Sequence, residues 1–308
     1  MKFASAPVRP LIALGAGLAA VGAAALLGLP SLAKAPEMRF TAATSAPPGG
    51  TYWHTKVLWK ETHPRQLGSG KNRYWVVEQL LAEEWSTPDG RSWLGSRNPG
   101  TYPKGAADRK AWRRDGSPAR WTRAADGQTV SLSTQPDKGH VSPVRGDNTF
   151  SLAGQKLTYD EVQRLPANPD RLKSWLAGAA RVSREMNVDM SVTEALPELL
   201  YLLPAPKEVR AAAYQALLTM PSVKSGGKAT DGVGRAGAAL SIAYPATGEK
   251  GKAMGLRVDL IVDTGTMLML SKGQTTLLDD KPFLDKTSTE TVLEAGWTDA
   301  GPAVPTLP

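Results

Sequence analysis

Apolar and polar residues alternate one by one along residues 53–60 of the chain. Trp53, Val57 and Trp59 share one parity, whereas His54 and Lys56 take the other. Successive side chains of a strand point to opposite faces, so this pattern predicts a strand of an antiparallel sheet with one buried face. A second run of aromatic and β-branched residues at 74–81 predicts a neighbouring strand.

The sequence Thr-Pro-Asp-Gly-Arg at 87–91 predicts a tight turn after that second strand. The proline fixes one backbone angle of the turn, and Gly90 accepts the left-handed conformation that the turn requires. Counting outward from the turn places Trp85 opposite Trp93 on the following strand. We therefore expect a hairpin with a cross-strand aromatic pair.

The hydrophobic period changes from two to 3.6 between residues 157 and 220, which predicts helices. Asn168 is expected to cap the first helix, with Pro169 as its first residue. A second helix is expected from Ser191, with Glu194 completing a capping box. A third is expected from about Pro206.

Strand patterns return after residue 222, at 236–244, 254–263, 266–271 and 289–297. Strands, then helices, then strands, without strict alternation, predict an α+β fold in which a helical layer covers one face of a curved antiparallel sheet. Such a layer encloses an apolar space. Residues 100–148 are rich in Gly, Pro and charge, and are expected to be irregular with a short strand near 129–133.

The segment from Leu11 to Leu29 holds nineteen residues without a charge. As a helix it would measure about 28 Å, close to the hydrocarbon thickness of a bilayer. We expect an uncleaved membrane anchor with the N-terminus inside the cell; cleavage as a signal peptide near Ala33-Lys34-Ala35 is the alternative.

The predicted organisation therefore has five parts. They are a short cytoplasmic head (1–9), a transmembrane helix (10–33), a linker (34–50), a single extracytoplasmic α+β domain (51–300) and a flexible tail (301–308). The linker is inferred from its Pro, Gly, Ser and Thr content.

Composition narrows the function further. The 308 residues include 37 Lys+Arg, 29 Asp+Glu and no Cys. The lack of Cys excludes disulfides, thiolate catalysis, Cys-ligated zinc, iron–sulfur clusters and a lipid-modified N-terminal Cys. The net charge of +8 favours an anionic neighbour. Since the domain is expected outside the cytoplasm, we predict contact with the membrane bilayer and no nucleic-acid partner.

Few residues suggest catalysis. The sequence Ile-Val-Asp-Thr-Gly-Thr at 261–266 resembles the loop that presents an aspartic protease carboxylate, but that chemistry needs a second Asp and no second such loop occurs. The alternative is a turn between two strands. His54, His63 and His140 lack the close spacing of metal ligands. We expect no enzyme, no metal and no cofactor, with a hydrolase using Asp263 as the alternative.

Seven of the nine tryptophans lie between residues 53 and 121. They could line a pocket for an apolar or saccharide ligand, or they could be ordinary core. The ligand-binding candidates are Trp53, Trp75, Trp85 and Trp93.

Residues 104–123 carry seven basic and two acidic residues with two interleaved tryptophans. This strip could rest on anionic headgroups, or it could be a solvated loop. The membrane-surface candidates are Arg109, Lys110, Trp112, Arg113, Arg114 and Trp121.

Several motifs occur in a specific order: Leu-Gly-Ser-Gly-Lys-Asn-Arg-Tyr-Trp-Val at 67–76, Trp-Ser-Thr-Pro-Asp-Gly-Arg at 85–91, and Ala-Gly-Trp-Thr-Asp at 295–299. Over about 50–300 they resemble a group of actinobacterial membrane-anchored proteins of unassigned function, often encoded beside extracytoplasmic-function sigma factors. The resemblance implies the lipoprotein-carrier and sigma-regulator sensor fold, an unclosed antiparallel barrel with a helical plug, and brings no catalytic residues. The short head before the anchor departs from that group.

These observations together predict a non-enzymatic, membrane-anchored extracytoplasmic protein. Its expected partner is an apolar or amphipathic envelope ligand, such as a lipid, or an envelope-stress signalling protein. A purely structural envelope module is the remaining alternative.

Overall fold

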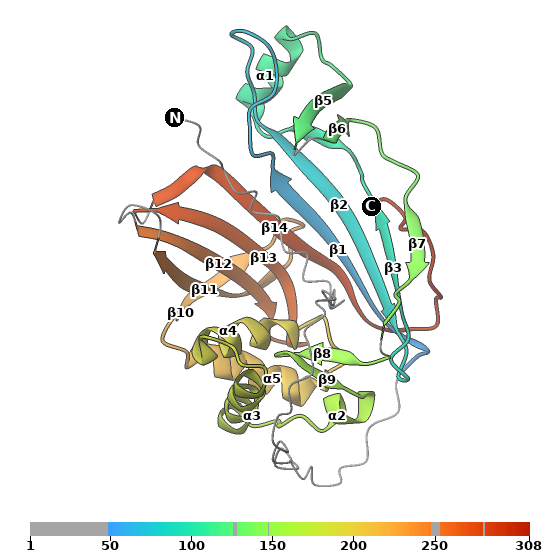
Figure 1. The fold of residues 1–308 in the computed structure, drawn as a ribbon, viewed down its shortest axis with the longest axis vertical. Coiled ribbons are helices and arrows are strands. Elements are labelled where there is room, and N and C mark those ends of the chain that lie inside the picture. Colours follow the sequence, from blue (N-terminus) through green and yellow to red (C-terminus); the bar gives the residue numbers. More distant parts are fainter. Residues whose placement is uncertain (1–48, 126–127, 147, 248–252, 280) are drawn as a thin grey trace, which may run out of the picture.

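The computed structural model describes residues 49–308 apart from 126–127, 147, 248–252 and 280. Fourteen strands and five helices are assigned to these residues (Figure 1). The strands are β1 (Tyr52–Thr62), β2 (Val76–Ser86), β3 (Ser92–Arg97), β4 (Thr101–Pro103), β5 (Arg120–Ala125), β6 (Gln128–Ser133), β7 (His140–Pro143), β8 (Phe150–Leu152), β9 (Gln155–Leu157), β10 (Val223–Thr230), β11 (Ala236–Thr247), β12 (Ala253–Asp263), β13 (Leu268–Leu278) and β14 (Lys281–Thr298). The helices are α1 (Ala106–Arg114), α2 (Tyr159–Gln163), α3 (Pro169–Val182), α4 (Val188–Glu198) and α5 (Lys207–Leu218).

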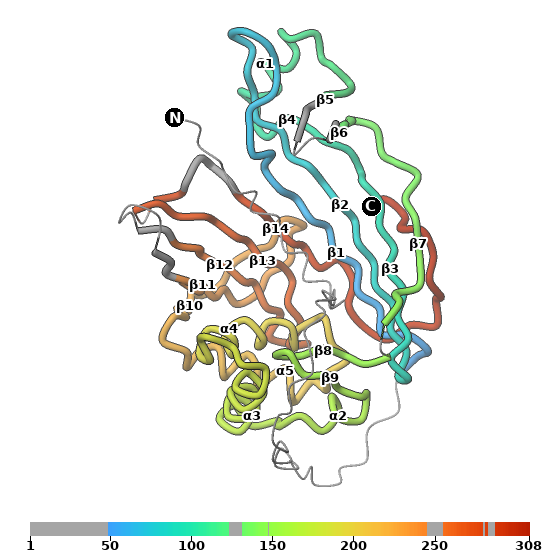
Figure 2. Tube along the Cα trace, viewed as in Figure 1, coloured from blue at the N-terminus to red at the C-terminus, as the bar shows by residue number. Residues whose placement is uncertain are grey.

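One curved, antiparallel, ten-stranded sheet organises the chain (Figure 2). Its order is β10-β11-β12-β13-β14-β1-β2-β3-β7, with β4 also paired to β2. Strands β10 and β7 end this order and do not pair with each other among the described residues, so the sheet is unclosed. Two small hairpins, β5-β6 and β8-β9, lie outside it.

Strand β14 joins the two halves of the sheet and creates a fork. Its first half pairs with β13 as far as Thr291, and its second half pairs with β1 up to Thr298. Beyond Thr291, β14 no longer pairs with β13, and the segment after α4 bonds to β13 there instead. The backbone N–H of Met269 on β13 donates a hydrogen bond to the carbonyl of Leu200, 3.1 Å away.

Helices α2–α5 cover one end of the sheet, and α1 lies at the opposite end (Figure 1). The sheet face packed against these helices, which we call the inner face, contributes Val57, Leu240 and Leu260 to the main hydrophobic core. We call the opposite side the outer face. A second, much smaller cluster at the α1 end consists of Tyr74, Val76, Ala111, Trp121 and Leu132.

The coarse fold prediction is confirmed: a mostly antiparallel, unclosed sheet carries a few helices. The hairpin at 87–91 and the pairing of Trp85 with Trp93 are present. Asn168 caps α3 by accepting a hydrogen bond from the backbone of Arg171.

Three expectations need correction. Helix α4 begins at Val188 because Asn187, rather than Ser191, caps it. The stretch expected to be irregular contains α1, whose first turn is held by Asp108 accepting hydrogen bonds from the N–H groups of Gly105 and Trp75. The edge strand β10 was not expected from its Lys-Ser-Gly-Gly-Lys sequence.

No helix among the described residues has the length and apolarity needed to cross a bilayer. The segment predicted to do so, Leu11 to Leu29, lies outside those residues.

Candidate functional site

The pleat of β1 and β2 separates the candidate tryptophans. Trp53 lies opposite Ser86, whereas its neighbour His54 lies opposite Trp85. Trp53 therefore points to the inner face, and Trp85 and Trp93 point to the outer face. Trp75 precedes β2, about ten residues or roughly 33 Å of strand away from Trp85. The four candidates do not share one pocket.

A cavity of about 370 Å³ opens at the fork between β13 and β14. At about 30 Å³ per molecule this volume equals roughly twelve waters. Its lining comes from β1, β14, α2, α5, the loop between α4 and α5, and the start of β13. The lining residues are Gly49, Trp53, Tyr159, Gln163, Pro204, Ala205, Pro206, Lys207, Glu208, Arg210, Leu268, Ala295, Gly296 and Trp297.

Three aromatic rings form one wall of this cavity. The rings of Trp53 and Trp297 meet edge to face with centroids 5.8 Å apart. The rings of Tyr159 and Trp297 also meet edge to face, with centroids 5.7 Å apart. These two contacts fix the ring planes, because edge-to-face geometry is the preferred arrangement at this separation.

The polar end of Trp53 is anchored in the loop after α4. Its Nε1 lies 3.2 Å from the carbonyl oxygens of both Tyr201 and Leu202. Trp53 is 5% exposed, so these carbonyls satisfy an indole N–H that burial would otherwise leave without water. The sheet and the helical layer are thereby joined beside the cavity.

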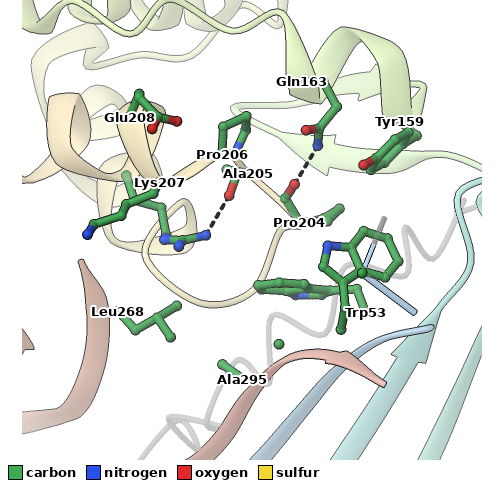
Figure 3. A pocket seen from close by; sticks show the side chains of 14 residues that line it. Trp53, Tyr159, Gln163, Pro204, Ala205, Pro206, Lys207, Glu208, Leu268 and Ala295 are labelled. Carbon is green, nitrogen blue, oxygen red and sulfur yellow. Dashed lines mark hydrogen bonds between the residues drawn. The ribbon is translucent and has the colours of Figure 1, made fainter. Parts of the chain in front are cut away.

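The loop that forms the rim is held on both sides (Figure 3). Gln163 donates a hydrogen bond of 2.6 Å to the Pro204 carbonyl, and Arg210 Nη1 donates one of 2.6 Å to the Ala205 carbonyl. Arg210 also donates to the carbonyl of Thr266 at the β12–β13 turn. The rim is therefore tied to α2, α5 and the sheet before any ligand arrives.

The rim carries both positive and negative side chains. Lys207 and Glu208 are exposed at the start of α5, and Arg210 follows about one helical turn later. Burial lowers the pKa of Arg210 from its ordinary value. Arginine nevertheless stays protonated in proteins, so Lys207 and Arg210 accompany Glu208 in the lining, and Asp263 lies near enough to Lys207 to interact with its charge.

Carboxyl groups on and above the inner face are partly or fully removed from solvent. Burial raises the pKa of Glu84 on β2 and of Glu198 on α4 to about 7 in each case. Glu290 on β14 is 1% exposed; burial raises its pKa too, although Lys272 lies 3.1 Å from it and Tyr201 donates a hydrogen bond of 3.3 Å.

The outer face behaves differently. Glu83, the residue next to Glu84, lies 3.0 Å from both His54 Nε2 and Lys56 Nζ. Burial alone would raise the pKa of Glu83, but these two partners outweigh it and hold the pKa below its usual value. His54 also stacks on Trp85, with ring centroids 4.9 Å apart.

The C-terminal residues lie over this outer face. Arg97 donates a hydrogen bond to the carbonyl of Pro305, which is buried, and Lys56 donates one of 3.4 Å to the Thr306 hydroxyl. The segment predicted as a flexible tail has no helix or strand. These residues nevertheless contact Arg97 and Lys56, and the nearby Glu83 and Trp85 are buried rather than lining an open groove.

The membrane-surface candidates divide between surface and core. Arg109, Lys110, Arg113 and Arg114 of α1 are exposed. Trp112 is half-buried and donates a hydrogen bond to the Pro118 carbonyl. Trp121 is buried and donates one of 2.9 Å to the Tyr74 hydroxyl, so it belongs to the small core and not to a surface.

Asp263 lies in the turn between β12 and β13. Its carboxylate accepts hydrogen bonds from the Gly265 backbone and the Thr266 hydroxyl, 2.8 and 2.7 Å long. These bonds lower the pKa of Asp263, and the nearby charge that acts on it is Lys207. The contacts are those of a turn, and among the described residues no carboxylate is placed to share its proton.

Sequence reasoning missed most of the cavity. Trp297 and Tyr159 supply two of the three rings of its aromatic wall, and Lys207 and Arg210 supply its positive charge, yet only Trp53 was a candidate. The Trp297 motif, Ala-Gly-Trp-Thr-Asp, was the available signal, because an aromatic residue at the end of a C-terminal strand faces the start of the first strand when the two pair.

No protein-family model matches the chain, and no curated protein matches it. Among solved structures, it is similar to a beta-barrel-like protein of the domain of unknown function DUF1849 from Brucella abortus. That similarity has a TM-score of 0.20 and 8% identity, and covers 82% of this chain and 100% of the other. At these values it carries no argument about the site or its ligand.

Proposed function

We propose that the protein binds an amphipathic ligand in the cavity at the fork between β13 and β14. The observation that carries this proposal is the pairing of an aromatic wall, formed by Trp53, Trp297 and Tyr159, with two cations at the rim. Ligand sites are typically apolar hollows with a few fixed polar groups that orient the ligand.

The ligand class follows from volume and charge. About 370 Å³ accommodates one short acyl or aromatic group but not a whole diacyl lipid. Lys207 and Arg210 at the rim could pair with a carboxylate or phosphate headgroup. An anionic amphiphile would therefore place its apolar part against Trp53 and Trp297, and its headgroup beside Lys207.

A membrane-anchored, extracytoplasmic location would give such a site its ligand, since the bilayer is a store of anionic amphiphiles. This location is a prediction from the Leu11 to Leu29 segment. Partnership with an envelope-stress signalling protein stays a prediction as well, resting on the family resemblance alone.

The test uses the full chain in phosphatidylcholine nanodiscs and 11-bromoundecanoate as the probe. Bromine quenches nearby tryptophan fluorescence, and we expect saturable quenching through Trp53 and Trp297. Ala295→Phe, which fills the cavity, should abolish the saturable component, whereas Ala243→Phe on an exposed position of β11 should leave it unchanged.

A second variant keeps the test informative if Ala295→Phe disturbs folding. Lys207→Glu leaves the cavity volume intact and reverses one rim charge. At about 1 kcal/mol for such a charge contact, the apparent affinity for the probe should fall at least about fivefold. Quenching that is linear and identical in all variants would refute the proposed site.

A further inference from the structure

Helix α1 presents an exposed face rich in basic side chains. Arg109 and Arg113, and likewise Lys110 and Arg114, are four residues apart, so both pairs lie on one side of the helix. All four residues are exposed. The opposite side is turned toward the protein: Ala111 is buried there, and Trp112 donates its indole N–H to the Pro118 carbonyl.

The two neighbouring acids offset part of this positive charge, but their carboxylates are engaged by other groups of the protein. Asp108 accepts hydrogen bonds from the backbone of Gly105 and Trp75. Asp115 accepts hydrogen bonds from the hydroxyls of Ser69 and Tyr74, and these contacts lower its pKa. Within the described residues no carboxylate forms an ion pair with the four cations of α1.

The basic face of α1 lies at one end of the sheet, far from the point where the chain enters the domain. It lies beyond the end of β1 and β2 that is farthest from α2–α5 (Figure 1). Strand β1 has eleven residues and therefore measures roughly 36 Å, so Gly49 and α1 stand at opposite ends of the sheet. The nineteen residues between Leu29 and Gly49 can span up to about 68 Å when extended.

We propose that the basic face of α1 docks on the anionic headgroups of a lipid bilayer. With Gly49 joined to the apolar segment at one end and α1 docked at the other, the β1–β2 ribbon lies along the membrane surface. This inference is independent of the cavity and its ligand.

Charge complementarity sets the expected size of the effect. Each basic residue near an anionic surface contributes about a fivefold preference for the docked state. Docking should be lost at high salt, since the Debye length falls from about 10 Å at 0.1 M to about 3 Å at 1 M.

The absence of Cys from the chain allows a clean test with one introduced label. Ala107→Cys, on an exposed position of α1, carries a nitroxide in the full chain reconstituted in nanodiscs. Collision with a nickel-chelating headgroup lipid is measured in pure phosphatidylcholine and in a 70:30 mixture with phosphatidylglycerol. We expect headgroup contact only in the anionic mixture, and its loss at 1 M salt.

Two charge-reversal variants provide the comparison. Arg109→Glu with Arg113→Glu should reduce the docked fraction at least about twentyfold relative to the undocked fraction. Lys224→Glu with Lys228→Glu makes the same charge change on the exposed edge strand β10 and should leave contact unchanged.

Three results would overturn the proposal. Equal contact in both lipid mixtures would mean that charge does not drive it. Equal loss of headgroup contact in the α1 and β10 variants would mean that the net charge of the protein, and not the basic face of α1, drives the contact. A duplex DNA oligonucleotide that binds through Arg109 and Arg113 while bilayer contact is absent would assign this face to a nucleic acid instead.

Discussion

Glu83 and Glu84 are consecutive residues of β2, yet their surroundings shift their acidities in opposite directions. Glu83 faces outward, where His54 and Lys56 hold its pKa below the usual value. Glu84 faces inward, where burial raises its pKa to about 7. The pleat alone assigns them to the two faces.

The two faces of the β1–β2 pair therefore differ in how their charged residues are arranged. On the outer face, charges are paired and covered by the protein's own C-terminal residues, which leaves a closed surface. On the inner face, Glu290 pairs with Lys272, Glu84 forms no ion pair among the described residues, and three aromatic rings border a cavity. For this reason we place the proposed ligand site on the inner face.

The largest expected effect comes from removing the inner-face anchor. Trp53→Ala should lower the free energy of unfolding by about 3–5 kcal/mol, because it opens a void and leaves the Tyr201 and Leu202 carbonyls without their donor. Trp93→Ala on the outer face should cost clearly less, since Trp93 is only half-buried. Urea titrations followed by circular dichroism compare the two, and equal losses would contradict the account.

Breaking the ion pairs of Glu83 with His54 and Lys56 on the outer face should have the next largest effect on stability. Glu83→Gln leaves Lys56 with the more distant Glu294 carboxylate, 3.7 Å away, and the Thr306 hydroxyl, and should cost about 1.5–3 kcal/mol. The double replacement Lys56→Met with Glu83→Leu should regain much of that loss, because it removes both charges together. Failure of the double variant to regain stability would show that the ion pair itself, rather than an unpaired charge, matters.

The pH dependence of stability should differ between the faces. Glu84 and Glu198 have pKa values raised from 4.5 to about 7, so the stability they contribute is complete below pH 4.5 and is lost as pH rises through 7. Glu83 has a lowered pKa, so its contribution is present above pH 4.5 and is lost as pH falls through the lower folded-state value.

Glu84→Gln and Glu198→Gln should therefore stabilise the protein at pH 8 and have little effect at pH 4. Glu83→Gln should destabilise it at pH 8 and lose that effect in acid. Thermal unfolding of the three variants across this range measures the contrast. Parallel pH profiles for Glu83→Gln and Glu84→Gln would contradict the assignment of faces.

The smallest effect should follow removal of residues 302–308. The truncation exposes the area under Pro305 and deletes the hydrogen bonds from Arg97 and Lys56, and should cost about 1–2 kcal/mol. Hydrogen exchange should accelerate in β3 and not in β11. Unchanged exchange in β3 would mean that the C-terminal segment contributes nothing to the outer face.

Local chemistry explains what the sequence predicted well. The parity of β1, the turn at 87–91 and the Asn168 cap each depend on residues close together in the chain. Helix α1 was missed because it lacks an apolar stripe; it is held by Asp108 reaching the Trp75 backbone, a contact 33 residues away in sequence.

The cavity was also missed because it depends on contacts between residues far apart in the sequence. Its walls depend on the pairing of the first strand with the last, which brings Trp297 to Trp53, and on the fork that admits the loop after α4. Counting tryptophans gave four candidates, but strand parity divides them between faces, and only pairing across the whole chain adds Trp297 and Tyr159.

The central claim, that the inner face and not the outer one receives an amphiphile, is tested most directly by fluorine NMR. The full chain is labelled with 5-fluorotryptophan in phosphatidylcholine nanodiscs, its nine signals are assigned with Trp→Phe variants, and dodecanoate is titrated in. We expect saturable shifts for Trp53 and Trp297 while Trp85 and Trp93 stay in place. Shifts at Trp85 and Trp93, or no saturable shift at any tryptophan, would contradict the account.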